Sequence, residues 1–253
     1  MKNDLVQKIL EKKLHCVFIS PHFDDAILSC GSLIAELNGK VNITIVNVFT
    51  KAHEKPYTFS ARKFLMDSGY PNAEELYEKR RVEDQKAFSS LSVNSINVGL
   101  EDALFRRNGK KTFLSKFIAE FDHYYPTYQF HITRTIASDD QSSMLLEKQL
   151  EKFNNSKYLV FAPFGIGNHA DHRIARLATE KKLDRYILYS DFPYNIRLHT
   201  YGTSFKNGED FHIDPNMNIK TSLIKAYKTQ FTGLFANGII PTHQEVYFSN
   251  KKL

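Results

Sequence analysis

The stretch Cys16-Val17-Phe18-Ile19-Ser20-Pro21-His22-Phe23-Asp24-Asp25 decides the fold. Its first four residues are a continuous apolar run, which is typical of a strand buried on both faces of a parallel sheet. A helical apolar pattern follows from Ile27 to Leu37, and a second apolar run extends over residues 41–49. Strand, loop, helix and strand in this order predict a right-handed βαβ unit.

The alternation of strand and helix patterns continues along the chain. Further strands are expected at residues 95–98, 129–133, 158–163 and 186–189. Further helices are expected at residues 4–13, 74–91, 113–121, 141–153, 170–177 and 220–235. This alternation predicts an α/β fold in one domain over residues 1–253, with a Rossmann-like, doubly wound, mainly parallel sheet and helices on both faces.

Composition and charge restrict the function classes. Of the 253 residues, 42% are hydrophobic and 25% are charged, which is typical of a soluble globular protein and excludes a mostly disordered chain. The net charge is +6, but the cations are scattered among acids, as in Glu78-Lys79-Arg80-Arg81-Val82-Glu83-Asp84. Nucleic-acid binding by counterion release needs clustered cations, so we expect no nucleic-acid partner and a solvated basic surface.

Targeting and redox signals are weak. No stretch reaches the roughly 18 apolar residues of a membrane span, and residues 1–13 lack the apolar core of a signal peptide. We therefore expect no membrane span and a cytoplasmic location.

The two cysteines, Cys16 and Cys30, lie in apolar surroundings, which predicts buried free thiols and excludes a disulfide scaffold or a cysteine-rich zinc module.

The first of two polar clusters follows the first predicted strand, at the end where open α/β sheets bind ligands. It is His22-Phe23-Asp24-Asp25, with three ionisable residues in four positions. Charged groups beside an apolar strand need partners or a metal. A helix cap is the alternative, and it explains one of the two acids but not the histidine and the second acid.

The second cluster, His169-Ala170-Asp171-His172, follows the apolar run of residues 158–163. Two histidines three positions apart at a strand-to-helix turn can face one space, and the acid between them can orient an imidazole. A helix start with exposed side chains is the alternative. Gly165 and Gly167 permit a tight loop before the cluster.

Together the clusters indicate a metal site. Imidazole and carboxylate suit Zn²⁺, and a catalytic zinc keeps three protein ligands and one open position. One acid and one histidine are then in surplus. A zinc hydrolase requires such a pair, because an acid takes a proton from water and a donor group stabilises the oxyanion.

The sequence resembles the PIG-L / LmbE-like family of zinc-dependent N-deacetylases. The family pattern is a Pro-His-x-Asp-Asp box and a later His-x-Asp-His box, which residues 21–25 and 169–172 match. Flanking segments are also similar, at residues 80–84, 102–106, 225–230 and 245–247. The likeness therefore spans nearly the whole chain.

The resemblance implies roles for nine residues. Three are expected to bind Zn²⁺, with Fe²⁺ as the alternative ion: His22, Asp25 and His172. Three are expected to be catalytic: Asp24 as general base, His169 as the group that stabilises the oxyanion, and Asp171 as the acid that fixes the His169 tautomer. Three are expected to contact the substrate: Arg81, Asp102 and Arg106.

The expected reaction is removal of an N-acetyl group from an amino sugar by zinc-activated water, on a small molecule or a glycoconjugate. Ala26 stands where the better-known thiol and lipid pathway members have Glu, which favours a sugar-modifying enzyme. The alternatives are a zinc hydrolase of another amide or an ester, and a catalytically silent glycan-binding relative. Residues 109–155 carry little family signal, and residues 138–141 are expected to be a surface loop rather than a lid. The sequence leaves homo-oligomerisation open.

Overall fold

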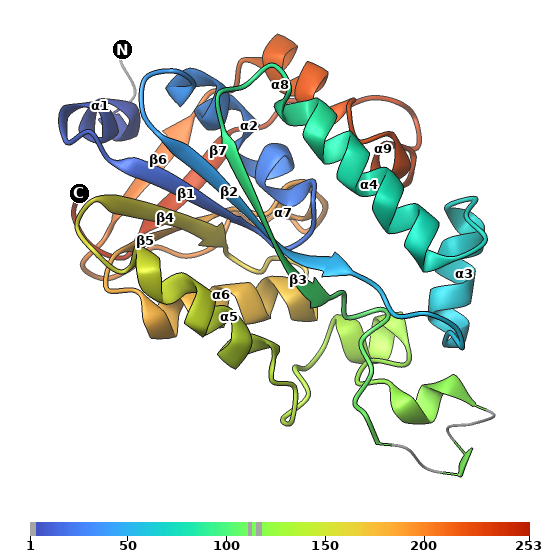
Figure 1. Cartoon of the computed structure of the whole chain (residues 1–253). Coiled ribbons are helices and arrows are strands. Elements are labelled where there is room, and N and C mark those ends of the chain that lie inside the picture. Colours follow the sequence, from blue (N-terminus) through green and yellow to red (C-terminus); the bar gives the residue numbers. More distant parts are fainter. Residues whose placement is uncertain (1–3, 111–112, 115–117) are drawn as a thin grey trace.

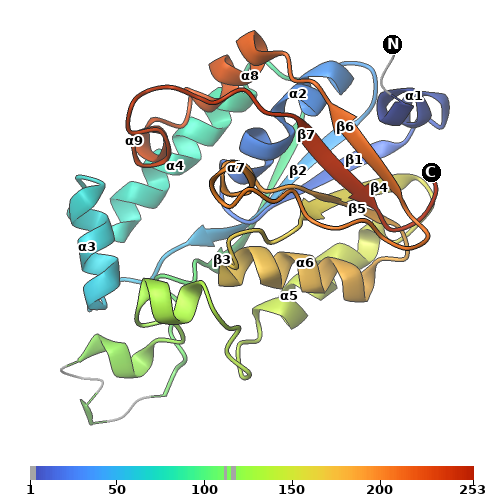
Figure 2. The ribbon, with the colours of Figure 1, turned by 180° about the vertical axis from the view of Figure 1, so that it is seen from behind.

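The computed structural model describes residues 4–110, 113–114 and 118–253. Its described strands form one sheet in the order β3-β2-β1-β4-β5-β7-β6, shown in Figures 1 and 2. The sheet is parallel from β3 to β5, and β7 runs antiparallel to both β5 and β6. The strand bounds are β1 His15–Ser20, β2 Ile43–Lys51, β3 Asn94–Glu101, β4 Tyr158–Pro163, β5 Tyr186–Tyr189, β6 Glu209–Ile213 and β7 Glu245–Ser249.

Helices cover both faces of the sheet, as predicted (Figure 1). One core contains Cys16 and Phe18 of β1, and the other contains Val17 and Ile19, because successive strand residues point to opposite faces. The first core packs against α1 Asp4–Glu11, α2 Asp25–Leu37, α3 Phe59–Asp67, α4 Ala73–Phe88, α8 Met217–Ile224 and α9 Lys228–Leu234. The second packs against α5 Ser142–Leu150 and α6 Ala170–Lys182.

The strand order reverses between β1 and β4. These strands are neighbours in the sheet, and the helix after β1 covers one face while the helix after β4 covers the other. The two connecting loops therefore diverge at the carboxyl ends of the strands and leave a crevice, which is where open α/β sheets bind ligands. The two polar clusters of the sequence lie in these two loops and in the first turns of the helices α2 and α6 that follow them.

Three expected elements differ in the structure. Residues 129–133 form no strand but belong to a π-helical turn, Tyr128–Ile132, in which Thr133 N–H bonds to Tyr128 O at 3.3 Å and satisfies the backbone locally. The helix expected at residues 113–121 lies partly outside the described residues, and its described end is a 3₁₀ turn, Ala119–Asp122. The helix expected at residues 220–235 is two helices, because the Glu83 carboxylate accepts bonds from Thr229 N–H and Oγ1–H and starts α9 separately.

The thiols of Cys16 and Cys30 are free and buried, as predicted. In the described part of the chain, no helix has both the length and the apolar character needed to cross a membrane. Residues Tyr194–Arg197 form the short helix α7, and residues Glu151–Phe153 form a 3₁₀ turn directly after α5.

A buried ion pair joins α8 to the first residue of β7. Lys220 Nζ lies 2.7 Å from Glu245 Oε1, and both side chains are fully buried. Lys220 Nζ also donates to His243 Nε2 at 2.9 Å. The His243 ring stacks on Phe192 with a centroid distance of 3.6 Å. Burial, and after it the Lys220 charge, lowers the pKa of His243 to about 3.

This environment predicts acid sensitivity of the fold. His243 takes up a proton near pH 6.5 when the chain is unfolded but resists protonation in the fold, so the folded state loses stability as the pH falls from 6.5 towards 3. The expected slope from this residue is about 1.4 kcal/mol per pH unit. His243→Gln keeps an acceptor for Lys220 but cannot titrate. Its free energy of unfolding in urea should therefore fall less steeply between pH 6.5 and 4.5, whereas equal slopes would contradict the assignment.

Candidate metal centre and active site

The loop after β1 sends its two adjacent acids in different directions. Ser20 Oγ accepts from Ala26 N–H at 2.9 Å and donates to His22 O at 2.5 Å, which folds the loop back on itself. His22 N–H donates to Asp25 Oδ2 at 2.7 Å. Asp24 occupies the N-cap position of α2 but makes no side-chain capping bond. Helix capping therefore does not account for Asp24, whose buried carboxyl group stays available for chemistry.

The loop after β4 relies on left-handed backbone to bring its histidines inward. Gly165 and Gly167 have φ of 87° and 89°, which other residues rarely adopt. Asp191 Oδ2 accepts from Gly165 N–H at 2.8 Å and from Ile166 N–H at 2.9 Å, and so anchors the loop to the end of β5. The loop delivers His169 to the N-cap of α6 and His172 to its first turn, where both side chains are buried.

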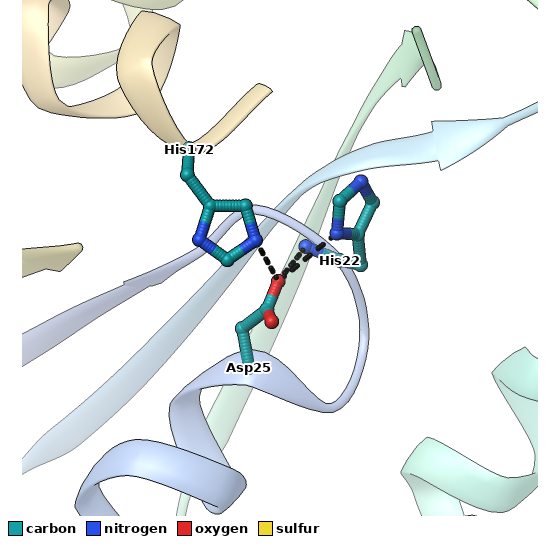
Figure 3. A group of neighbouring side chains, drawn as sticks. All are labelled: His22, Asp25 and His172. Atoms are coloured by element: carbon teal, nitrogen blue, oxygen red, sulfur yellow. Dashed lines mark hydrogen bonds and ion pairs between the residues drawn. The ribbon is translucent and has the colours of Figure 1, made fainter. Parts of the chain in front are cut away.

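His22, Asp25 and His172 converge on one point (Figure 3). Asp25 Oδ2 lies 3.1 Å from His22 Nδ1 and 3.3 Å from His172 Nε2. A tetrahedral zinc ion with bonds of about 2.0 Å separates its ligand atoms by about 3.3 Å. Two imidazoles and a carboxylate at this spacing fit a catalytic zinc site, and Figure 3 shows them arriving from the β1 loop, α2 and α6.

Further carboxylates stand behind the two imidazoles. His172 Nδ1 lies 2.7 Å from Asp191 Oδ1. His22 Nε2 lies 3.1 Å from Asp171 Oδ2 and 3.4 Å from Asp102 Oδ2. Metal-binding histidines commonly donate their other ring N–H to such a carboxylate, which fixes the ring and its tautomer. The sequence pattern did not single out Asp191 as a site residue. Its position just after the strand of residues 186–189, at the ligand-binding end of the sheet, is the signal that could have identified it.

Asp24 and His169 line a cavity of about 330 Å³ together with His22 and Asp25. Burial, and after it the neighbouring Asp25, raises the pKa of Asp24 to about 7. Burial, and after it His22, lowers the pKa of His169 to about 4, so this imidazole is neutral at neutral pH. Asp171 N–H lies 3.3 Å from His169 Nδ1, which makes Nδ1 the acceptor and leaves the ring proton on Nε2.

A model of the PIG-L family, described as GlcNAc-PI de-N-acetylase, matches residues 17–182. The chain belongs to the PIG-L family. Among its relatives, a 2'-N-acetylparomamine deacetylase of Niallia circulans is 26% identical over 239 residues, which cover 87% of this chain and 82% of that protein. Both metal boxes of this PIG-L chain lie inside the matched range.

Solved structures share the fold of this PIG-L chain. A deacetylase in complex with teicoplanin, from the teicoplanin biosynthesis pathway, has a TM-score of 0.69 at 21% identity, covering 93% of this chain and 97% of the other. An N,N'-diacetylchitobiose deacetylase from Pyrococcus horikoshii has a TM-score of 0.54 at 14% identity, covering 97% of this chain and 88% of the other. At these identities the likeness establishes the Rossmann-like fold.

Of the three residues expected to contact substrate in this PIG-L protein, the structure brings only Asp102 to the cavity. Arg81 points away from it on α4, pairs with Glu78 and lines a different cavity. Its neighbour Arg80 lines the cavity instead, because one step along a helix turns a side chain by about 100°. The sequence pattern placed both arginines on this helix but did not fix which of them faces inward.

Arg106 also departs from the expectation. Its side chain is 5% exposed, and it forms ion pairs with Asp140 and Asp171 instead of lining the cavity. The Asp171 carboxylate therefore bonds to Arg106 and lies beside His22, while its backbone N–H is the group that bonds to His169. That Asp171 fixes the His169 tautomer stays a prediction, and the structure places its backbone N–H, rather than its carboxylate, against the His169 ring.

Arg80 has the features of a ligand-binding side chain. It is 7% exposed and its Nε has no hydrogen-bond partner. Its guanidinium lies over the rings of Phe64 and Tyr77, at 5.4 Å from each centroid, and the residue lines the same cavity as Asp24. A buried donor without a protein partner is costly, so we expect a water or ligand atom to bond to this guanidinium.

Proposed function

We propose that this chain is a zinc-dependent hydrolase that removes an N-acetyl group from an amino-sugar substrate. The observation that carries the proposal is the division of the buried groups around the cavity. His22, Asp25 and His172 converge on one point, while Asp24 and His169 line the same cavity outside that set. His169 also groups with His22 and Asp171, but the Asp171 carboxylate is already ion-paired with Arg106, which favours the first set as the metal ligands. A structural metal site has no need of a base and a neutral hydrogen-bond donor at its open side.

The proposed chemistry divides among these groups. Zn²⁺ supplies a Lewis acid that polarises a carbonyl group and lowers the pKa of water to about 7. Asp24, whose pKa is about 7, accepts a proton from the attacking water and passes it to the leaving amine. The Nε2–H of neutral His169 donates to the substrate oxygen as negative charge develops on it. The products are an amine and acetate.

The amino-sugar class rests on two supports. The family model is described as GlcNAc-PI de-N-acetylase, and the Niallia circulans relative is named 2'-N-acetylparomamine deacetylase. Arg80, Asp102 and Arg197 also line the cavity, and their polar side chains can bond to the hydroxyl groups of a sugar.

The test is release of acetate from N-acetylglucosamine-containing substrates by the zinc-loaded protein. We expect turnover of at least one N-acetyl amino sugar and formation of the free amine, detected by mass spectrometry. O-acetyl sugars and N-acetyl amino acids serve as comparison substrates for the alternatives, an esterase and a hydrolase of other amides. Zinc binding without turnover of any of these substrates would indicate a silent binding relative.

Arg80 gives a prediction specific to the substrate. Arg80→Met should lower kcat/KM by about 10- to 100-fold, because the substrate loses a charge-assisted hydrogen bond of about 1.5–3 kcal/mol. The Arg80 charge also lowers the pKa of Asp24, so the pH profile of the variant should shift towards higher pH if the base is affected too. Zinc content should not change, since Arg80 does not belong to the metal-binding set. Arg81→Met is the matched control, one position along the same helix but facing a separate cavity, and should stay within about twofold of the parent. Steady-state kinetics on the two variants decide the question, and equal losses would refute the assignment.

A further inference from the structure

A buried guanidinium links the metal centre to the family-atypical part of the chain. Arg106 follows β3, and its guanidinium donates to Glu101 O through Nε at 2.8 Å and through Nη2 at 2.6 Å. Nη1 donates to Asp140 Oδ2 at 2.6 Å, and Nη2 also pairs with Asp171 Oδ1. The Phe49 ring lies 4.6 Å from the guanidinium carbon. The Arg106 guanidinium is thus held in place by a backbone carbonyl, two carboxylates and an aromatic ring.

Asp140 comes from residues 138–141, the polar stretch that the sequence analysis expected to be a surface loop. Its side chain is 1% exposed. Beyond its bond to Arg106, its carboxylate accepts from Tyr125 O–H at 2.8 Å and from Ser142 N–H, at the start of α5, at 2.9 Å. This part of the stretch is therefore a buried anchor, while the adjacent Asp139 is exposed and pairs with Lys110.

At the other end of Arg106, Asp171 faces a metal-binding histidine. Asp171 Oδ2 accepts from Ala103 N–H at 2.9 Å and lies 3.1 Å from His22 Nε2. A carboxylate that is ion-paired with Arg106 acts only as an acceptor, so a His22 ring that gives up its Nδ1 proton to bind the metal keeps its other proton on Nε2. The lone pair of Nδ1 is then directed towards Asp25 and the metal position.

We infer that Arg106 is a positioning residue for the metal centre, which it serves by holding Asp171 against His22. Asp140, which the segment between β3 and α5 brings in, holds the other side of the guanidinium. The inference rests on the proposed metal site, and it assigns a role to a segment that carries little family signal. A lysine cannot replace this arginine fully, since a single ammonium group cannot reproduce the planar fork.

The experiment measures zinc affinity by competition with a chromophoric chelator, so it does not depend on turnover. Arg106→Met should weaken zinc binding by about 10- to 100-fold, as loss of an outer-shell partner does. Arg106→Lys keeps the charge and should recover part of this loss. Arg107→Met is the matched control, because it removes the adjacent guanidinium, whose bonds go to Asp122 and Glu54 O and not to Asp171, and it should bind zinc like the parent.

A double-mutant cycle separates positioning from general destabilisation. If Arg106 acts through Asp171, then Asp171→Asn lowers zinc affinity and the addition of Arg106→Met to it costs little more. Additive losses, or zinc affinity unchanged in both Arg106 variants, would overturn the inference. Should Arg106→Met not fold, Arg106→Lys in the same cycle answers the question. A parent protein that binds no zinc would instead refute the proposed function, so the two failures are distinguishable.

Discussion

Removal of the metal by a chelator is expected to abolish deacetylation, and addition of Zn²⁺ to the chelated protein is expected to restore it. The reason lies in the donor set, because His22, Asp25 and His172 hold the metal in the cavity that Asp24 and His169 also line, and the metal supplies the Lewis acid. His172→Ala should remove one of three ligands and reduce both zinc content and activity to background. Metal analysis and acetate release, measured on the same samples, check this result.

The charge balance of the site adds a pH dependence to zinc binding. Burial favours the neutral form of His172, but the carboxylates of Asp25 and Asp191 outweigh burial and raise its pKa to about 10. Burial acts on His22 in the same way, and Asp102, Asp171 and Asp25 together raise its pKa well above the usual value. Without metal, both imidazoles are therefore protonated at neutral pH.

Zinc has to displace these protons, so its apparent affinity should rise with pH, by about tenfold per pH unit for each proton released. Calorimetry in buffers of different ionisation enthalpy counts the protons directly. His53→Ala is the control for His172→Ala, since His53 lies outside the metal set, pairs with Glu101 and is 40% exposed. Zinc binding that releases no protons, or a fully active His172→Ala variant, would contradict the assigned ligands.

The position of the site could be predicted from the sequence because it depends on few residues. Each polar box directly follows an apolar run, and the strands of these two runs, β1 and β4, are neighbours in the sheet. Strand ends at a reversal of strand order open towards one crevice, so two local patterns suffice to bring the boxes together. The family resemblance then assigned the residues within each box.

The supporting residues could not be predicted because their roles depend on rotation and long-range packing. Arg80 and Arg81 share one helix, and only the docking of α4 decides that Arg80 faces the cavity. Asp140 bonds to Arg106 although the two residues are 34 positions apart in the sequence. No local sequence pattern indicates such a contact. The break between α8 and α9 likewise depends on Glu83, a residue of α4, and not on the sequence of the helices themselves.

The second large effect is expected for Asp24→Asn, which should lower kcat by about 10²–10⁴-fold while the protein still binds zinc. The asparagine has nearly the same shape as the carboxyl group but cannot accept a proton. Asp24 makes no capping bond, so the change removes no helix cap. The residue also lies outside the metal-binding set, and its loss should leave the three ligands in place.

A matched control for this change exists in the same part of the fold. Asp84 is also buried, and burial is the largest cause that raises its pKa to about 7, the same value as for Asp24. Its carboxylate accepts from Tyr227 O–H and Asn47 Nδ2–H, and it does not line the cavity. Asp84→Asn should therefore keep activity within about tenfold, because it changes a buried acid without removing a base from the reaction. Single-turnover acetate release, with zinc content measured in parallel, distinguishes the two variants. If zinc-loaded Asp24→Asn turned over like Asp84→Asn, another group would have to take the proton, and the division of labour between Asp24 and Asp25 would be wrong.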